Sequence, residues 1–442
     1  MLKQVTSTLL LLALLFCAGA KTAVADNLAS QRDQMKMVLN VVSKEVAKNF
    51  YDADLKGLDW KALTDQAQQK IDKAQSVTDM MRAIFILVEK LKDSHTRFLP
   101  PGRNTSYRFG FNAKPIGDEV RVYEVKEKGV AEAAGIKLGD RILAVNTFRA
   151  DRSLYDLMMW DFKVVCNAPF LELKIQTGEE APRTIHLEAK KKVEPVVLDF
   201  RGDRGDIWDL IRELDLDQPL WHYRAFKDGI GYVQIRAFDY ESEDFFVGLI
   251  DKAEAKRAVV LDLRSNGGGY EDTLKAFVGN FESDQVVMGD VKGRKKDEQL
   301  VIKPRRPHYD MPMYILIDSE TGSAAEMFAR HFQLRKKAVI LGDRSSGRVT
   351  RSIYYPEKIG TDPIVPFGVQ IDMGRVVFPD GGELEKNGVT PDVPCLPSGK
   401  EMRDGQDVCL WKAIAMAREK LGLPPDASVM EGKSTELTHS PW

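Results

Sequence analysis

The stretch LDLRSNGGGYED, residues 261–272, joins a short apolar run to three glycines and then to a helix-like segment. Glycine lets the backbone turn sharply and brings N–H groups close to a bound group. Such donors stabilise an oxyanion in some proteins, hold a phosphate in others, and in many form only a tight turn. No Gly-Lys-Ser/Thr follows the glycines, so the sequence does not support a nucleotide-phosphate loop.

Around this stretch, apolar runs of strand length alternate with helical segments. The expected strands are GIGYVQIRAF, RAVVLDLRSN, MYILIDS and KAVILGD, and the expected helices are SEDFFVGLIDKAEAK, YEDTLKAFVGNF and AAEMFARHFQLRKK. This alternation predicts an α/β core with a largely parallel sheet over residues 193–430. The polar residues 431–442 are expected to form a frayed tail.

Two regions of different character precede this core. Residues 26–103 carry apolar side chains at three- and four-residue spacing, which predicts helices. Residues 104–192 contain short β-rich runs separated by turns, with a short helix that ends at Gly135. The chain is therefore predicted to be a multidomain α/β protein.

The first 25 residues have the pattern of a secretory signal peptide. Lys3 precedes an apolar run through Phe16, and small residues follow up to Ala25, the expected cleavage point, with Ala20 as a second candidate. Lipidation at Cys17, which would attach the protein to a membrane, is the minor reading because Phe16 is a poor residue to precede a lipidated cysteine. We therefore expect an exported protein, periplasmic or extracellular.

Composition excludes several classes of partner. Of 442 residues, 43% are hydrophobic and 29% are charged, and the formal net charge is −2, so neither nucleic acid nor an anionic membrane is expected as the general partner. Neither a cofactor nor a metal is expected, because no Cys/His cluster has metal-site spacing. Cys395 and Cys409 would be able to form a disulfide after export, although free buried thiols are an equal alternative. The oligomeric state is left open.

Ser323 stands in TGSAAEMF, between an apolar run and a helical segment. The ordinary reading of such a serine is a helix N-cap. The alternative is a nucleophile, because free N–H groups at a helix start, among them that of Ala324, would stabilise an oxyanion. The local pattern alone favours the N-cap.

The order of motifs along the chain changes that weighing. DSHTRFL (93–99) comes first, then a segment with RFGF (108–111) and AEAAGIKLGDRILAVN that resembles a PDZ domain, then DLRSNGGG (262–269), GSAAE (322–326), GDRSSGR (342–348) and LEKNGVTPDV (384–393). This series resembles the C-terminal processing, or tail-specific, serine peptidases with a PDZ domain, including their tricorn-type relatives. The resemblance implies a crotonase- or ClpP-like α/β catalytic core that cleaves proteins or peptides, often near their C-termini.

The resemblance also implies roles for individual residues. Ser323 falls on the nucleophile, and Ala324 together with Gly269 or Gly268 falls on the oxyanion hole. In a PDZ domain a peptide adds a strand to a sheet edge and its terminal carboxylate binds a loop. The loop residues here are Arg108, Phe109, Gly110 and Phe111. A module that packs on its neighbour and binds nothing is the alternative.

The general base is the point at which the chain departs from the tail-specific pattern. The expected lysine lies 25 residues after the serine, and that position holds Arg348 (348 − 323 = 25). Arginine stays protonated, so it cannot accept the serine proton. The tricorn-type relatives imply a substitute, His95, assisted by Ser94 and Glu385. A purely structural role for His95, and Glu383 in place of Glu385, remain open.

Two functions follow from these alternatives. The first is an exported serine peptidase in which Ser323 attacks a substrate that docks through its C-terminus. The second is an inactive relative that binds C-terminal peptides or scaffolds an envelope complex, because the expected lysine is replaced.

Overall fold

The computed structural model describes residues 28–103, 105–193, 221–226, 228–238, 243–360 and 364–425. The predicted signal peptide, including Cys17, and the predicted tail lie outside the described residues. No helix within the described ranges has both the length and the apolar character needed to cross a membrane.

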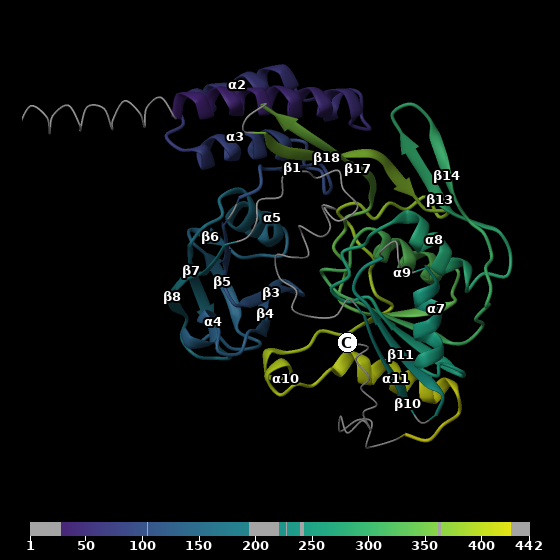
Figure 1. Cartoon of the computed structure of the whole chain (residues 1–442). Helices are drawn as coiled ribbons and strands as arrows, with labels where there is room; N and C mark the ends of the chain where they lie inside the picture. Colours follow the sequence, from purple (N-terminus) through teal and green to yellow (C-terminus); the bar gives the residue numbers. More distant parts are fainter. Residues whose placement is uncertain are drawn as a thin grey trace, which may run out of the picture.

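The N-terminal region is helical, as predicted. Residues 28–49 form the first helix, followed by α2 (Trp60–Lys73) and α3 (Val77–Glu89). Asp59 and Ser76 cap the second and third helices by accepting hydrogen bonds from backbone N–H groups. The apolar faces of these helices pack on the strands β1, β17 and β18 described below, along the top of the molecule in Figure 1.

A PDZ-like unit follows. It contains a two-stranded pair, the short helices α4 and α5, and a six-stranded sheet in the order β3-β4-β5-β7-β8, in which β6 pairs with β5 outside this order. Within the described strands, β3 pairs only with β4, so one edge of β3 is open. The elements are β2 (Thr105–Arg108), β3 (Phe111–Ile116), β4 (Glu119–Val125), α4 (Val130–Ala133), β5 (Arg141–Val145), β6 (Phe148–Arg149), α5 (Tyr155–Trp160), β7 (Phe170–Gln176), β8 (Arg183–Glu188) and β9 (Lys190–Val193).

The core sheet has the order β10-β11-β12-β15-β16-β19, with every pairing parallel except that of β10 with β11. The predicted largely parallel sheet is therefore confirmed. Its strands are β10 (Trp221–Phe226), β11 (Ile230–Ile235), β12 (Ala258–Asp262), β15 (Met313–Ile317), β16 (Ala338–Gly342) and β19 (Val393–Pro394).

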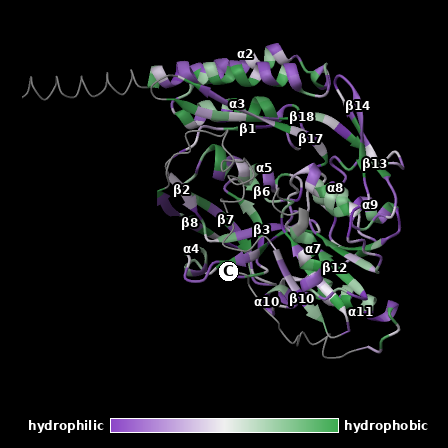
Figure 2. Cartoon of the chain, turned by 45° about the vertical axis from the view of Figure 1, so that its right-hand side comes forward, coloured by the Kyte–Doolittle hydropathy of each residue, from purple (hydrophilic) through white to green (hydrophobic). Residues whose placement is uncertain are grey.

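Helices cover both faces of this sheet, which explains why its central strands β12 and β15 are buried along their whole length. Val259 and Leu261 pack with side chains of α7 (Glu243–Lys252), α8 (Glu271–Gly279) and α9 (Ala324–Leu334). Val260, on the opposite face, packs with α11 (Val408–Lys420). Successive residues of a strand point to opposite faces, so a sheet covered twice needs continuous apolar runs. Figure 2 shows these strands as hydrophobic segments between the helices.

A second, antiparallel sheet was not anticipated from the sequence. It has the order β1-β18-β13-β14, and β17 pairs with β18. Its strands are β1 (Arg97–Leu99), β13 (Val286–Gly293), β14 (Asp297–Ile302), β17 (Thr350–Ile359) and β18 (Val365–Val377). Since β1 follows directly after Ser94-His95, its pairing with β18 fixes that turn against the C-terminal half of the chain.

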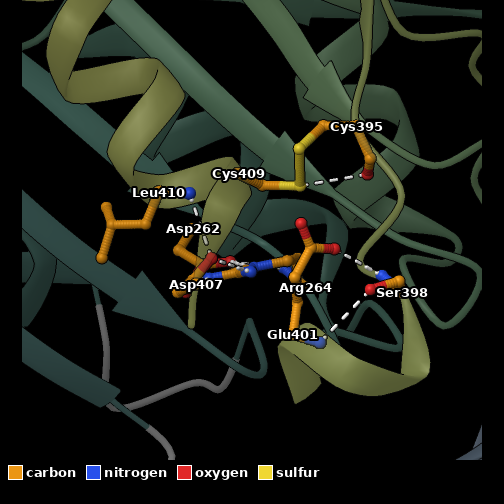
Figure 3. Close-up of a disulfide and its surroundings, with 8 residues drawn as sticks. All are labelled: Asp262, Arg264, Cys395, Ser398, Glu401, Asp407, Cys409 and Leu410. Carbon is orange, nitrogen blue, oxygen red and sulfur yellow. Dashed lines mark hydrogen bonds and ion pairs between the residues drawn. A yellow bond between two sulfur atoms is a disulfide. The ribbon is translucent and has the colours of Figure 1, made fainter. Parts of the chain in front are cut away.

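The DLR part of the glycine motif holds the start of α11. Arg264 donates hydrogen bonds to Asp262 and to both carboxylate oxygens of Asp407, at 2.9 and 2.6 Å for the latter. Asp407 is in turn the N-cap of α11 and accepts a hydrogen bond from Leu410 N–H. Cys395 and Cys409 form a disulfide beside this network, as Figure 3 shows. The disulfide alternative of the sequence analysis is therefore the observed one.

The PDZ-like unit packs against the core through polar contacts and one close backbone approach. Lys114 of β3 lies 2.6 Å from Asp318, and Arg152 lies 2.8 Å from Asp343. Gly139 faces Gly399, the first residue of α10 (Gly399–Arg403), so closely that a Cβ on Gly139 would lie 2.3 Å from Gly399 O.

Candidate active site

Ser323 lies at the junction between β15 and α9, where it is the N-cap of the helix. Its φ of 51° places it in the left-handed region, which costs a residue with a side chain about 1–3 kcal/mol and is found at functional turns. Gly268 approaches it closely: a Cβ on Gly268 would lie 2.6 Å from Ser323 Cβ. A glycine is thus required at 268 because the backbone passes beside the serine, and at 269 because a Cβ there would lie 2.2 Å from Phe238 O.

Glu326 holds the Arg348 loop beside Ser323. This buried carboxylate accepts hydrogen bonds from the backbone N–H groups of Gly347 and Arg348, both at 2.8 Å, and from Ser323 N–H at 3.0 Å. It also accepts hydroxyl hydrogen bonds from Ser345 and Ser346. Ser323 N–H further donates to Arg348 O at 2.8 Å. The glutamate of the SAxE motif therefore joins the serine to the turn that contains Arg348.

Backbone donors for an oxyanion gather beside Ser323. Ala324 N–H is the first of α9, and within the described residues neither it nor Gly269 N–H has a hydrogen-bond acceptor. Gly268 differs, because its N–H donates to Asn266 Oδ1 at 2.8 Å. Asn266 is itself held by a hydrogen bond from its amide to Ile235 O. The loop thus leaves the N–H groups of Ala324 and Gly269 available to a ligand.

His95, Ser94 and Glu385 form a hydrogen-bonded chain across 291 residues of sequence. Ser94 Oγ donates to Glu385 Oε2 at 2.7 Å and lies 2.9 Å from His95 Nδ1. Because the one hydroxyl proton of Ser94 goes to the carboxylate, His95 Nδ1 must carry the proton that binds Ser94 Oγ. This tautomer leaves Nε2 unprotonated, which is the form a general base needs. Thr350 Oγ1 lies 3.1 Å from the same Nδ1.

Burial keeps His95 neutral. Burial and, to a smaller extent, the nearby cation of Arg348 together lower the pKa of His95 to about 3, with Asp93 opposing. Burial also raises the pKa of Glu385, an effect opposed by the hydrogen bond from Ser94. A neutral imidazole, and a carboxylate held by hydrogen bonds instead of an ion pair, are consistent with the hydrogen-bonded series from His95 through Ser94 to Glu385.

Arg348 points away from the role of a base. Its backbone lies beside Ser323, but its guanidinium forms an ion pair with Asp156 of α5, in the PDZ-like unit. The position of the expected lysine therefore holds a cation that connects the two units. Glu383 is likewise excluded from the centre, because it pairs with Arg375 at the surface, 3.1 Å away.

The His95 turn, the glycine turn and Arg348 line one cleft of about 350 Å³. Ser323 lies at its border: Gly322 is part of the lining, and no hydrogen bond joins Ser323 Oγ to His95 among the described residues. Hydrogen bonds between catalytic groups are often long in unliganded enzymes. The lining on the core side includes Ser94, His95, Gly268, Gly269, Gly322 and Arg348.

The same cleft extends into the PDZ-like unit. The open edge of β3 contributes Phe111, Asn112 and Ala113, and α5 contributes Tyr155 and Met159. In the RFGF segment, Phe109 is buried, Gly110 turns the chain with a φ of 71°, and Arg108 pairs with Lys190 across β2 and β9. A strand edge and a helix thus flank a groove that leads from this loop to His95 and the glycine turn.

Several site features were missed in the sequence analysis. The role of Glu326 had a local signal, since Ser323-x-x-Glu326 is a capping-box pattern. Thr350 and Asp156 had none, because only the fold brings them to His95 and Arg348. His331, two turns further along α9, is buried and paired with Glu282 at 2.9 Å, so it belongs to the packing of the helix.

Three protein-family models match successive parts of the chain. The model of peptidase family S41 matches residues 229–395, that of the tricorn protease C1 domain matches residues 33–85, and that of the PDZ domain matches residues 101–151. The chain is 24% identical over 80% of its length to the chloroplastic carboxyl-terminal-processing peptidase 1 of Arabidopsis thaliana, of which it covers 71%. It is 23% identical over 74% of its length to carboxy-terminal processing protease CtpB of Bacillus subtilis, of which it covers 68%.

Solved structures show the same fold. Mature CPAF superposes with a TM-score of 0.64 at 13% identity, over 92% of this chain and 99% of that chain. The photosystem II D1 C-terminal processing protease gives a TM-score of 0.51 at 19% identity, over 82% and 93% of the two chains. The chain thus has a PDZ domain and an α/β core that matches peptidase family S41, and over most of its length it is similar to the C-terminal processing, or tail-specific, serine peptidases.

Proposed function

We propose that the chain is an active, exported endopeptidase in which His95, rather than a lysine, is the general base for Ser323. One observation carries this proposal: His95 and Ser94 line the same cleft as the glycine turn beside Ser323, and Ser94 links His95 Nδ1 to Glu385 behind them. This link favours the imidazole tautomer whose Nε2 accepts a proton. Among the described residues, Arg348 has no such arrangement and pairs with Asp156 instead.

The reaction follows from these groups. Ser323 Oγ attacks the scissile carbonyl carbon while its proton passes to His95 Nε2. The negative oxygen of the tetrahedral intermediate is stabilised by the N–H groups of Ala324 and Gly269. His95 then protonates the leaving amine, which breaks the peptide bond and leaves an ester on Ser323. A water molecule, deprotonated by His95, hydrolyses that ester.

The PDZ domain is proposed to bring the substrate to this site. An extended peptide would add a strand to the open edge of β3, with its terminal carboxylate at the Arg108–Phe111 loop. The cleft continues from β3 and α5 to His95, so a chain bound there reaches the catalytic groups. This arrangement supports cleavage of proteins near their C-termini.

Export is the second part of the proposal. The residues 1–25 have the pattern of a cleavable signal peptide, and the Cys395–Cys409 disulfide is typical of proteins that fold in an oxidising compartment. The mature protein would begin at Asp26.

The test is cleavage of an unfolded protein by the mature chain and by two variants. Ser323→Ala and His95→Ala are each expected to lower kcat by about 10³-fold or more, with unchanged circular dichroism spectra. Lys336→Ala, exposed at the end of α9, is the control and should retain full activity. Full activity in Ser323→Ala would overturn the proposal.

An inactive, peptide-binding relative is the competing function, and Arg348 at the lysine position favours it. A fluorophosphonate probe separates the two. The active reading predicts covalent labelling of Ser323 that is lost in His95→Ala. The inactive reading predicts peptide binding with no labelling at any pH.

A further inference from the structure

The cleft holds hydrogen-bond donors that have no partner. Arg97 Nε, Arg236 Nε and Trp160 Nε1 are buried, and none of the three bonds to an acceptor in the part of the chain that the structure describes. All three residues line the active-site cleft. Buried donors without acceptors are rare because each costs free energy, so a cluster of them indicates a missing acceptor.

The acidic residues of the cleft are already engaged. Asp156 pairs with Arg348, and Glu320 accepts a hydrogen bond from Ser265 at 2.7 Å and lies 3.5 Å from Lys114. Glu89 lies near Arg97, and burial raises its pKa to about 7, but the two form no ion pair. No carboxylate of the described residues is therefore paired with Arg97 or Arg236.

Arg97 enters the cleft from the catalytic turn. It is two residues after His95, at the start of β1, and its guanidinium lies 5.2 Å from the ring centroid of Trp160. Burial and the cation of Arg348 lower the pKa of Arg97. The cations of Arg97 and Arg348 thus lie near each other in a poorly solvated place. Such a place favours a bound anion, since the attraction between opposite charges increases as the dielectric constant falls.

Arg236 enters from the side of the glycine turn. It follows β11 directly and stands two residues before Phe238, whose N–H donates to Gly268 O at 2.9 Å. Phe238 also pairs with Gly269 as an isolated bridge. Arg97 is thus on the segment that carries His95, and Arg236 is on the segment that pairs with the oxyanion loop. Both line the cleft in which the scissile bond would lie.

We propose that Arg97 and Arg236, with Trp160, form a subsite that binds a carboxylate of the peptide substrate beside the scissile bond; this inference rests on the proposed peptidase function. The guanidinium fork matches a carboxylate in two-point geometry. Apolar side chains of the same cleft, Leu99, Met159 and Val164, would pack the aliphatic part of a glutamate side chain. The subsite is separate from the Arg108–Phe111 loop.

The test begins with a substrate whose cleavage site has been mapped by mass spectrometry. Glutamate or glutamine is placed at each position from three before to three after the scissile bond, and kcat/KM is measured for each pair. At one position glutamate is expected to be preferred by about tenfold or more, the usual effect of a charge-assisted pair of hydrogen bonds.

The arginines are then tested directly. Arg97→Gln and Arg236→Gln should each reduce the Glu/Gln ratio of kcat/KM to about one, whatever their effect on the rate with the glutamine peptide. Arg257→Gln removes a cation from the exposed amino end of β12 and should leave the ratio intact. Arg97→Lys keeps the charge and should retain part of the preference for glutamate. It replaces Arg97→Gln in the test if that variant folds poorly.

Peptides with a free or an amidated C-terminus identify the source of the carboxylate. A preference for the free terminus that disappears in Arg236→Gln would assign the subsite to a chain end, and one that persists belongs to the PDZ loop. Fluorescence anisotropy on Ser323→Ala measures the same preferences as binding, without turnover. If all peptides are cleaved and no preference for a carboxylate depends on the arginines, only the subsite is overturned. If no peptide is cleaved but the binding preference is intact, only the peptidase function is overturned.

Discussion

Two turns line the cleft beside Ser323, and they are held in different ways. The turn with Arg348 is fixed through its backbone, because Glu326 accepts its N–H groups and Ser323 N–H donates to Arg348 O. The turn with His95 is fixed through its side chains, by Ser94, Glu385 and Thr350. In the first turn the side chain at position 348 is free to vary while the shape is kept. The second turn depends on the identity of its side chains.

The largest effect is expected from breaking the backbone anchor. Glu326→Gln places an amide that donates hydrogen bonds against N–H groups that also donate, so the Arg348 loop should detach from Ser323. We expect a loss of about 3 kcal/mol in the free energy of unfolding, and at least a hundredfold loss of activity. Urea denaturation and peptide cleavage measure the two effects.

Glu401 provides the matched control for that experiment. It caps α10 in the same Ser-x-x-Glu pattern, with Ser398, but at the surface. Glu401→Gln should cost less than about 1 kcal/mol and leave activity unchanged. Equal effects of the two variants would contradict the role assigned to Glu326.

The next effect concerns the side-chain anchor of His95. Glu385→Gln keeps the shape but removes the charge that accepts the Ser94 proton, so we expect a loss of about a hundredfold in kcat with little change in KM. Glu383→Gln, two residues away and paired with Arg375, should stay within about twofold of the parent. A larger loss from Glu383→Gln would reassign the carboxylate.

The charge at position 348 is expected to act on the pH profile. The pKa of His95 is depressed to about 3, so the base stays unprotonated and activity should persist as the pH falls below 6. Arg348→Met removes a cation that lowers this pKa, so the acid limb of kcat/KM should move to higher pH. Arg348→Lys keeps the charge and should keep the limb, with a change in rate below about tenfold. An unmoved limb in Arg348→Met would disprove the coupling.

The smallest effect is expected at Thr350. Thr350→Val preserves the shape and removes the second hydroxyl near His95 Nδ1, at 3.1 Å. Because Ser94 still binds that nitrogen, activity should fall by only about threefold. Ser94→Ala is the comparison and should fall further, since it also breaks the contact with Glu385.

The contrast between the turns also explains what the sequence could reveal. The parallel strands were recognisable because each is an unbroken apolar run covered on both faces. The long strand β18 was not, since Gln370 and the buried Asp372 interrupt its apolar pattern. Burial and the neighbouring Asp93 raise the pKa of Asp372, which favours its neutral, protonated form.

The site divides along the same line. Ser323, Ala324 and the glycines could be predicted because they lie in contiguous motifs. His95, Ser94 and Glu385 could be named only through the resemblance to a family, since no local pattern joins residues 291 positions apart. Nothing in the sequence pointed to Arg97 and Arg236. The Nε donors of both side chains lack an acceptor among the described residues, and that is a property of the folded cleft.

The backbone contact between Gly139 and Gly399 sets how far the PDZ domain can shift. A Cβ on Gly399 would lie 2.7 Å from both Gly139 O and an Arg121 guanidinium nitrogen, so a single methyl group here acts as a wedge. Gly399 stands on the loop that the Cys395–Cys409 disulfide closes, which makes one side of this joint stiff. The two domains thus meet at a backbone contact that leaves no room for a side chain on either partner. We expect Gly399→Ala to push the PDZ domain away from the core and so to alter the cleft, although the contact touches no catalytic group.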